Sequence, residues 1–237
     1  MLERKFTSYL TKFLTEERNK ILLVNGARQI GKSYLIRYVG RKLFSHFVEI
    51  NLKEDKEGDK VFADVRTTDD LYMRLSNYCP TPLGDNTDTL VFLDEIQSYP
   101  HLMTMLKFLN QESRYRFIAS GSQLGVALAQ TPSVPLGSVT IEQMYPLDFE
   151  EFLWATGVGK EWIANIRECY LCRKSLDEST HNLLLKRFQY YLLVGGLPEA
   201  VNNYLADRNM VRVRRTHSDI HNLYRIDASQ YDEEHKL

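Results

Sequence analysis

The sequence is poor in the features that mark secreted or membrane-spanning proteins. It has three cysteines, and an odd count without a signal peptide favours reduced thiols over a disulfide framework. No apolar stretch reaches the roughly 20 residues that a transmembrane helix needs, and residues 1–6 lack the apolar core of a signal peptide. These absences exclude a disulfide scaffold and favour a cytoplasmic protein with no membrane partner.

An excess of charge of either sign is also missing. The 237 residues include 30 Lys and Arg and 31 Asp and Glu, so the formal net charge is −1. This net charge gives no reason to expect binding to nucleic acid or to a membrane surface. The basic cluster Arg212, Arg214 and Arg215 could contact phosphates, but such a run is more often the solvated face of a helix. We expect a protein partner rather than nucleic acid, and no pattern selects an oligomeric state.

Cys169 and Cys172 have the C-x-x-C spacing of zinc and redox sites. A zinc site needs a second ligand pair, which His181 alone does not supply. A redox pair follows a strand and opens a helix, whereas this one lies within a helical stretch. We interpret the two cysteines as structural.

Residues 26–33 read Gly-Ala-Arg-Gln-Ile-Gly-Lys-Ser, between the apolar run 21–24 and the helical pattern 34–39. Gly, four residues, then Gly-Lys-Ser between a strand and a helix is the Walker A pattern of a phosphate loop. Its glycines let backbone N–H groups converge on an anion, and the helix N-terminus adds its dipole. A turn that merely ends in Lys-Ser is the alternative, but the flanking elements favour the phosphate loop. The residues expected to contact nucleotide are Gly26, Ala27, Arg28, Gln29, Ile30, Gly31, Lys32, Ser33 and Tyr34.

A second motif of the Walker B type, Asp94-Glu95, ends the apolar run 90–93. Lys32 is expected to reach the β- and γ-phosphates, and Ser33 and Asp94 to hold Mg²⁺. Glu95 is expected to polarise the attacking water. Acidic pairs after apolar runs are also common on surfaces, so the upstream phosphate loop is what favours the catalytic interpretation. A general base at this position favours hydrolysis. The Asn-Lys-x-Asp motif by which GTPases recognise guanine does not occur, so the expected nucleotide is ATP.

Ser120, Ser122 and Gln97 are further candidates beside the γ-phosphate. The two serines follow the strand-like run 115–119, where a neighbouring strand brings a polar group to the site. A simple Ser-Gly-Ser turn is an equally good interpretation. Gln97 is a candidate for sensing or orienting water.

Strand-like runs alternate with helical patterns up to residue 147, which predicts a three-layer α/β core with a parallel sheet and its ligands at the carboxyl ends of the strands. Beyond that point only helical patterns occur, so we expect a core at residues 1–147 and a helical lid at 148–237. Expected loops are 53–60 and 131–137. Expected strands are 21–25, 46–52, the apolar run 90–93 that ends in the two carboxylates, 115–119 and 138–144. Expected helices are 2–14, 32–42, a short one capped by Thr68 or Asp69 that runs through Tyr78, one from about 100, one capped by Asp148, 161–174, 179–194, one from Pro198 and 210–226. The core face expected for helix 179–194 consists of Leu183, Leu184, Phe188, Tyr191 and Leu192.

As a set, five blocks resemble the predicted prokaryotic AAA+-type ATPases of the STAND-related P-loop lineage. The resemblance implies an ATPase core, a helical lid, ATP and Mg²⁺ as ligands, and a further C-terminal domain. It gives Asp94, Glu95 and Ser122 the magnesium, base and sensor roles. It also likens residues 196–198 to a Gly-x-Pro motif whose Pro198 packs near the base, although a helix stop followed by a helix start explains the same residues. The blocks are residues 26–33, 92–97, 119–122, 145–153 and 195–201.

The sequence departs from that family at two places. Gly137-Ser138 stands where family members commonly carry Gly-Arg or Gly-Lys, and no Lys or Arg occurs between Arg116 and Lys160. Ring-forming AAA+ proteins keep the arginine finger for a neighbour's nucleotide in that window, and a finger supplies much of the rate in phosphoryl transfer. The departure disfavours hydrolysis activated by a neighbour in a ring.

We therefore hypothesise a Mg²⁺-dependent ATPase that works as a nucleotide-dependent switch. The alternative is a binding module that holds ATP without hydrolysing it and recruits a protein or nucleic-acid partner.

Overall fold

The computed structural model describes residues 2–79, 82–122 and 137–229. Contacts divide the chain into two compact units, one made of residues 6–27 and 31–144 and the other of residues 1–5, 28–30 and 145–237. We call them the sheet unit and the helical unit. The tip of the expected phosphate loop, residues 28–30, therefore groups with the helical unit.

A five-stranded sheet with the order β2-β3-β4-β1-β5 forms the centre of the sheet unit. Every pairing in it is parallel, and Leu23 of β1 lies opposite Ala119 of β4 and Ile141 of β5. The carboxyl ends of the strands consequently share one edge, as ligand sites on such sheets require. The strands are β1 (Ile21–Asn25), β2 (His46–Asn51), β3 (Thr89–Asp94), β4 (Arg116–Gly121) and β5 (Val139–Gln143).

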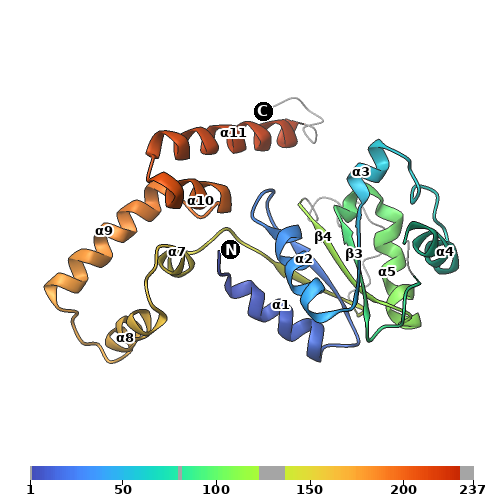
Figure 1. Cartoon of the computed structure of the whole chain (residues 1–237), viewed down its shortest axis with the longest axis horizontal. Coiled ribbons are helices and arrows are strands. Elements are labelled where there is room, and N and C mark those ends of the chain that lie inside the picture. The colour runs from blue at the N-terminus through green and yellow to red at the C-terminus, as the bar shows by residue number, and fades with distance from the viewer. Residues whose placement is uncertain (1, 80–81, 123–136, 230–237) are drawn as a thin grey trace. The chain divides into compact units, whose positions relative to one another are not determined.

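Helices cover both faces of this sheet. Figure 1 shows α1 and α2 on one side and α4 and α5 on the other, so the unit has the three layers that the sequence predicts. Residues 90–93 of β3 are all fully buried, as expected for a parallel strand packed on both faces. The helices are α1 (Lys5–Glu16), α2 (Lys32–Leu43), α3 (Leu52–Glu57), α4 (Thr68–Tyr78) and α5 (Pro100–Glu112), with the short 3₁₀ helix η1 at Ile96–Ser98.

The expected loop at residues 53–60 is wrong in part, because α3 occupies its first half. Asn51 caps this helix by accepting hydrogen bonds from the backbone N–H groups of Lys53 and Glu54, and the buried side chain of Leu52 anchors it. Two acidic residues in the first turn suit the positive end of the helix dipole. The charged run is thus a capped helix with one apolar contact.

Smaller differences concern element ends. The cap of α4 is Thr67, which accepts a hydrogen bond from the N–H of Asp70 at 3.2 Å, rather than Thr68 or Asp69. β4 continues through Ser120 and Gly121 instead of ending before them. The expected loop at 131–137 lies outside the described residues except at its last position.

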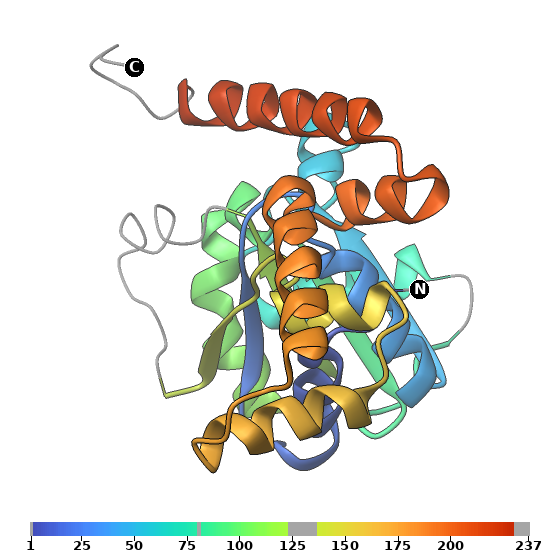
Figure 2. The same cartoon turned by 90° about the vertical axis from the view of Figure 1, so that its left-hand side faces the viewer.

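The helical unit contains α7 (Phe149–Ala155), α8 (Lys160–Leu171), α9 (Glu178–Val194), α10 (Pro198–Asp207) and α11 (Met210–Ser229). Asp148 caps α7 as expected, in a capping box with Glu151. Figure 2 shows α10 and α11 side by side, in the red part of the colour bar. The core of the unit is formed by Leu147, Phe152, Val194, Ala200, Val201, Tyr204 and Val213.

The core face expected for α9 is partly wrong. Of the residues assigned to it, Leu183 is 46% exposed and Leu192 is 66% exposed, whereas Tyr191 packs against Phe149 and Phe152. The periodic pattern identified the helix correctly. It did not identify which apolar residues face the core, because α9 carries apolar side chains around most of its circumference.

Two glycines join α9 to α10. Gly195 has φ 70° and ψ −170°, a conformation essentially restricted to glycine. Gly196 lies against Leu147, whose N–H donates to the Gly196 carbonyl at 2.7 Å. Pro198 opens α10 at its first position, as expected. Within the described residues, no helix is both long and apolar enough to cross a membrane.

Candidate functional site

The phosphate loop connects the end of β1 to the start of α2. Gly26 has φ 155°, Gln29 has φ 64° and Gly31 has φ 93°. Positive φ at these positions curls the backbone in the way that lets successive N–H groups converge on an anion. Gly31 is the N-cap of α2, so the positive end of that helix lies at the loop.

Lys32 is held inside the loop. Its Nζ donates to the carbonyl oxygens of Gly26 at 2.8 Å and Ala27 at 2.9 Å, and the residue is 5% exposed. The ammonium group therefore lies within the curl of the loop, where a phosphate can exchange for carbonyl partners.

Asp94 joins the phosphate loop to two strands. Its Oδ2 accepts a hydrogen bond from Ser33 Oγ at 2.7 Å, and its Oδ1 accepts one from Ser120 Oγ. Burial raises the pKa of the Asp94 carboxyl, and the neighbouring Glu95 charge adds to the rise, while the two serine hydroxyls oppose it. A buried carboxylate whose pKa is raised in this way marks a candidate functional site.

Glu95 follows in a strained conformation, with φ 53°. Its Oε2 accepts hydrogen bonds from Gln97 Nε2 and from Ser122 Oγ, the latter at 3.1 Å. Left-handed backbone at a non-glycine residue costs free energy and is enriched at functional sites. Among the described residues, the buried Gln97 Oε1 has no hydrogen-bond partner, which leaves an acceptor available beside the Glu95 carboxylate.

The site residues expected from the sequence thus fall into two hydrogen-bonded groups. One contains Ser33, Asp94 and Ser120, and the other contains Glu95, Gln97 and Ser122. Gly26 and Lys32 form the loop beside the first group. Tyr34 is 55% exposed in the first turn of α2. Pro198 belongs to the helical unit.

Two side chains that the sequence analysis missed contact the tip of the loop. Arg4 Nη1 donates to the Ile30 carbonyl at 3.1 Å, and Tyr224 Oη donates to the Arg28 carbonyl at 2.8 Å. Both contacts lie within the helical unit, which contains residues 28–30. They join positions 26 and 196 residues apart, and no local pattern signals contacts at such separations.

The donor set suits Mg²⁺. A serine hydroxyl and one carboxylate are hard oxygen ligands, and Mg²⁺ typically takes one or two protein ligands and completes its shell with phosphates and water. In the described part of the chain, no group of three or more His, Cys, Asp or Glu side chains is placed to hold a metal. An all-protein metal cage is therefore not what these residues form.

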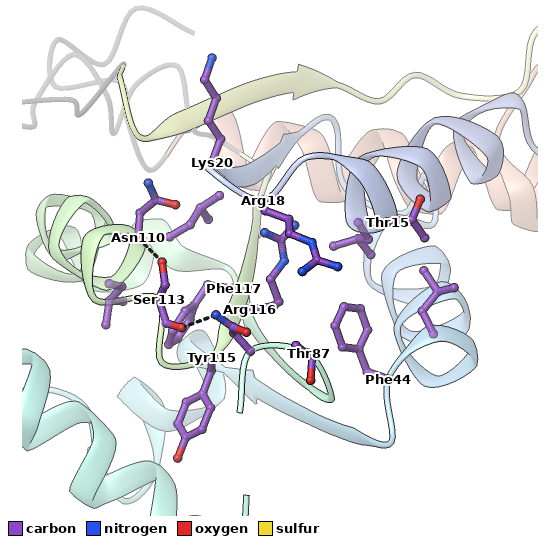
Figure 3. Close-up of a pocket in the computed structure, with 15 residues that line it drawn as sticks. Thr15, Arg18, Lys20, Phe44, Thr87, Asn110, Ser113, Tyr115, Arg116 and Phe117 are labelled. Atoms are coloured by element: carbon purple, nitrogen blue, oxygen red, sulfur yellow. Dashed lines mark hydrogen bonds between the residues drawn. The ribbon is translucent and has the colours of Figure 1, made fainter. Parts of the chain in front are cut away.

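A separate cavity of about 250 Å³ lies near the amino ends of β1 and β4. Figure 3 shows Arg18, Lys20 and Arg116 among the residues that line it, together with Phe44. The parallel strands place this cavity at the edge of the sheet opposite Asp94. It is therefore distinct from the phosphate loop.

The cations around this cavity have a structural explanation. α1 ends at Glu16 and α5 ends at Glu112, so helix ends that carry partial negative charge lie near it. Arg116 donates to the Glu17 carbonyl just beyond α1. Burial lowers the pKa of Arg116, and the Arg18 charge adds to that effect, but a guanidinium stays protonated.

Comparison with known proteins agrees with this fold. A Walker-type ATPase of Pyrococcus abyssi has a TM-score of 0.57 at 15% identity, over 97% of this chain and 75% of that one. AMPPCP-bound DnaA from Aquifex aeolicus has a TM-score of 0.50 at 11% identity, over 90% of this chain and 64% of that one. Identities this low show the fold alone, and no curated protein matches the sequence.

These likenesses confirm the expected α/β fold with a parallel sheet of the P-loop NTPase type. Residues 18–153, more than half of the chain, match a family described as an AAA domain. That range contains the phosphate loop, Asp94, Glu95 and Ser122. The chain therefore belongs to this AAA domain family, within the AAA+ class of P-loop ATPases.

Proposed function

We propose that the protein is a Mg²⁺-dependent ATPase that hydrolyses ATP to ADP and phosphate. The observation that carries the proposal is the 2.7 Å hydrogen bond from Ser33 Oγ to Asp94 Oδ2. It brings together the hydroxyl that ends the phosphate loop and the carboxylate that ends β3. Two separate nucleotide motifs thereby meet in one site.

In this proposal the loop binds the phosphates. The N–H groups of residues 26–34 and the N-terminus of α2 form the anion cradle. Lys32, which now donates to the Gly26 and Ala27 carbonyls, transfers its hydrogen bonds to the β- and γ-phosphates. Ser33 and Asp94 hold Mg²⁺, which when bound neutralises charge on the phosphate oxygens.

Glu95 is the proposed general base. Its Oε2 is oriented by Gln97 Nε2 and Ser122 Oγ, which leaves its other oxygen to accept a proton from water. The Gln97 Oε1, which has no partner among the described residues, is proposed to accept a second hydrogen bond from that water. Ser122 then acts as a sensor that positions the base.

Pro198 is proposed to lie near the base of the nucleotide. Within the helical unit its neighbour Leu197 lines an open groove of about 630 Å³ together with His217, Ile220 and Tyr224. Apolar and aromatic side chains are the usual lining of such ligand grooves.

In the same proposal, residues 1–147 are the ATPase core, and residues 148–237 are a lid whose conformation depends on the bound nucleotide.

The proposal is tested by steady-state ATP hydrolysis with Mg²⁺, read beside Lys32→Ala and Glu95→Gln. Lys32→Ala should abolish nucleotide binding. Glu95→Gln should keep binding and lose turnover, because only the base is removed. Normal turnover in Glu95→Gln would remove the assigned base.

A second candidate function is a module that holds ATP without hydrolysing it and recruits a partner, most simply a protein. The absence of Lys and Arg from residues 117–159 favours it, because ring-type enzymes of this class keep their arginine finger there. Tight ATP binding with no turnover at any protein concentration would support this alternative over the ATPase.

A further inference from the structure

The tip of the phosphate loop is held from outside the nucleotide motifs. The carbonyl oxygen of Arg28 accepts a hydrogen bond from Tyr224 Oη at 2.8 Å. The carbonyl oxygen of Ile30 accepts one from Arg4 Nη1 at 3.1 Å. Between them, Gln29 takes a left-handed conformation with φ 64°, so the tip is a sharp bend with a donor on each side.

These two contacts determine where two amide hydrogens point. In a planar trans peptide, the C=O of one residue and the N–H of the next point in opposite directions, and no peptide bond of the described chain is cis. Fixing the Arg28 carbonyl therefore directs the Gln29 N–H away from Tyr224. Fixing the Ile30 carbonyl likewise directs the Gly31 N–H away from Arg4.

Arg4 is itself fixed by a buried network. Its Nε donates to Glu151 Oε2 at 3.2 Å, and the two side chains are 7% and 5% exposed. Its Nη2 donates to the Tyr145 carbonyl. Glu151 Oε1 in turn accepts from the N–H of Lys5 at 2.6 Å. A guanidinium with so many fixed partners loses little further freedom in holding the Ile30 carbonyl.

The same network reaches the start of α7. Glu151 Oε2 accepts from the N–H of Asp148 at 3.1 Å, and Asp148 Oδ1 accepts from the N–H of Glu151 at 2.8 Å. The Glu151 carboxylate, which completes the capping box of α7, therefore also orients the arginine that holds the loop. Tyr224 connects the loop in the same way to α11.

We propose that Arg4 and Tyr224 are positioning residues for nucleotide binding, which hold the phosphate loop by its outer carbonyls so that the Gln29 and Gly31 N–H groups face the phosphates. The inference rests on the proposed nucleotide binding. It adds that affinity depends on residues far from both nucleotide motifs. By linkage, nucleotide bound in the loop must in turn favour the two hydrogen bonds that Arg4 and Tyr224 make to it.

The test measures Mg²⁺–ATP affinity of the full chain by titration with a fluorescent ATP analogue. Tyr224→Phe removes one hydroxyl and keeps the ring. Arg4→Lys keeps the positive charge beside Glu151 but loses the planar guanidinium, which donates to several acceptors at once. We expect each to weaken affinity about three- to tenfold, the worth of one hydrogen bond. In turnover, KM should rise while kcat changes little, because Glu95 is untouched.

Two variants serve as matched controls. Tyr170→Phe changes a tyrosine that is 81% exposed on α8. Arg167→Lys changes an arginine paired with Glu150 of α7 at 2.9 Å. Each makes the same chemical change with no contact to residues 28–30 among the described hydrogen bonds, so affinity should stay within about twofold.

A purely structural role predicts a different result. Tyr224→Phe and Arg4→Lys would then lower the melting temperature yet bind the analogue as tightly as the parent well below that temperature, and this outcome overturns the inference. If Arg4→Lys fails to fold, Tyr224→Phe alone decides. Failure of the proposed function is recognised separately, because the parent chain would then bind no better than Lys32→Ala.

Hydrogen exchange gives a second readout. Mg²⁺–ATP should slow exchange of the Gln29 and Gly31 amides and of amides in α11 near Tyr224 in the parent chain. In Tyr224→Phe the slowing in α11 should be lost, while that of the Lys32 and Ser33 amides remains. Equal slowing of α11 in both proteins would contradict the proposed role of Tyr224.

Discussion

Ser33 Oγ donates to Asp94 Oδ2 at 2.7 Å, across 61 positions of sequence. The contact exists because β1 and β3 are parallel strands of one sheet, so the phosphate loop after β1 and the carboxylate at the end of β3 lie at the same edge. Ser120 Oγ donates to the other oxygen of the same carboxylate. One helix, α2, and two strands, β3 and β4, thus contribute to the orientation of one buried acid.

Ser33→Ala should remove the Mg²⁺ dependence of nucleotide binding. The hydroxyl is one of two proposed protein ligands, and a hydrogen bond or ligand contact to a charged group is worth about 1.5–3 kcal/mol, roughly ten- to a hundredfold in affinity. Calorimetric titration of ATP with and without Mg²⁺ measures the effect. Ser45→Ala, at an exposed serine after α2, is the control and should keep the full Mg²⁺ effect.

Asp94→Asn should stabilise the nucleotide-free and metal-free protein at neutral pH. Burial raises the pKa of Asp94 in the folded state, so as pH rises the unfolded chain loses this proton first and folding becomes less favourable until the folded pKa is passed. Asparagine stays neutral throughout. The serine hydroxyls can rotate to pair with its amide.

Melting temperatures measured from pH 3 upward check the predicted direction in which the stability difference between Asp94→Asn and the parent changes with pH. The advantage of Asp94→Asn over the parent should be absent at the acid end, where both side chains are neutral, and should grow as pH rises. Asp59→Asn changes one charge at an exposed position and should show no such trend. A constant or shrinking difference between Asp94→Asn and the parent would contradict the assignment.

Ser122→Ala should lower kcat about tenfold and leave KM nearly unchanged. Ser122 Oγ donates to Glu95 Oε2 at 3.1 Å, and removing a group that orients a general base affects the reaction step more than substrate binding. Single-turnover hydrolysis measures this step directly. Ser179→Ala, on the exposed surface of α9, provides the comparison. A change confined to KM would assign Ser122 to binding instead of to positioning the base.

Much of the sheet unit could be predicted from local sequence. The β1–loop–α2 segment has a fixed motif, and the fully apolar run of β3 before Asp94 has only one good interpretation in a parallel sheet. α3 was missed because a charged run indicates a loop by composition, while the decisive signal was one residue, the capping Asn51. Local composition is weak where a single side-chain hydrogen bond selects the conformation.

Contacts of long sequence separation were not predictable. Arg4 and Glu151 are 147 positions apart, and neither differs from an ordinary charged residue on an amphipathic helix when the sequence is inspected alone. The exposed Leu183 and Leu192 of α9 illustrate the reverse case. Their apolar character predicts burial, but the described core of the helical unit packs against other positions of the helix.

The last prediction concerns the junction between α9 and α10. Its residues 196–198 have two interpretations, a Gly-x-Pro motif near the nucleotide base or a helix stop followed by a helix start. A Cβ placed on Gly196 would lie 2.1 Å from the carbonyl oxygen of Leu147, and its two next contacts are also Leu147 backbone atoms. Backbone cannot move aside as a flexible side chain can. Gly196→Ala should therefore destabilise the protein by about 1–3 kcal/mol or more.

Urea unfolding followed by circular dichroism measures this loss. Gly137→Ala is the matched control, because a Cβ there meets nothing within 4 Å and should change stability by less than about 0.5 kcal/mol. If Gly196→Ala is as stable as the parent, the close approach to Leu147 is not a constraint. If it is destabilised, the glycine is required by packing, whatever role the following Pro198 has toward nucleotide.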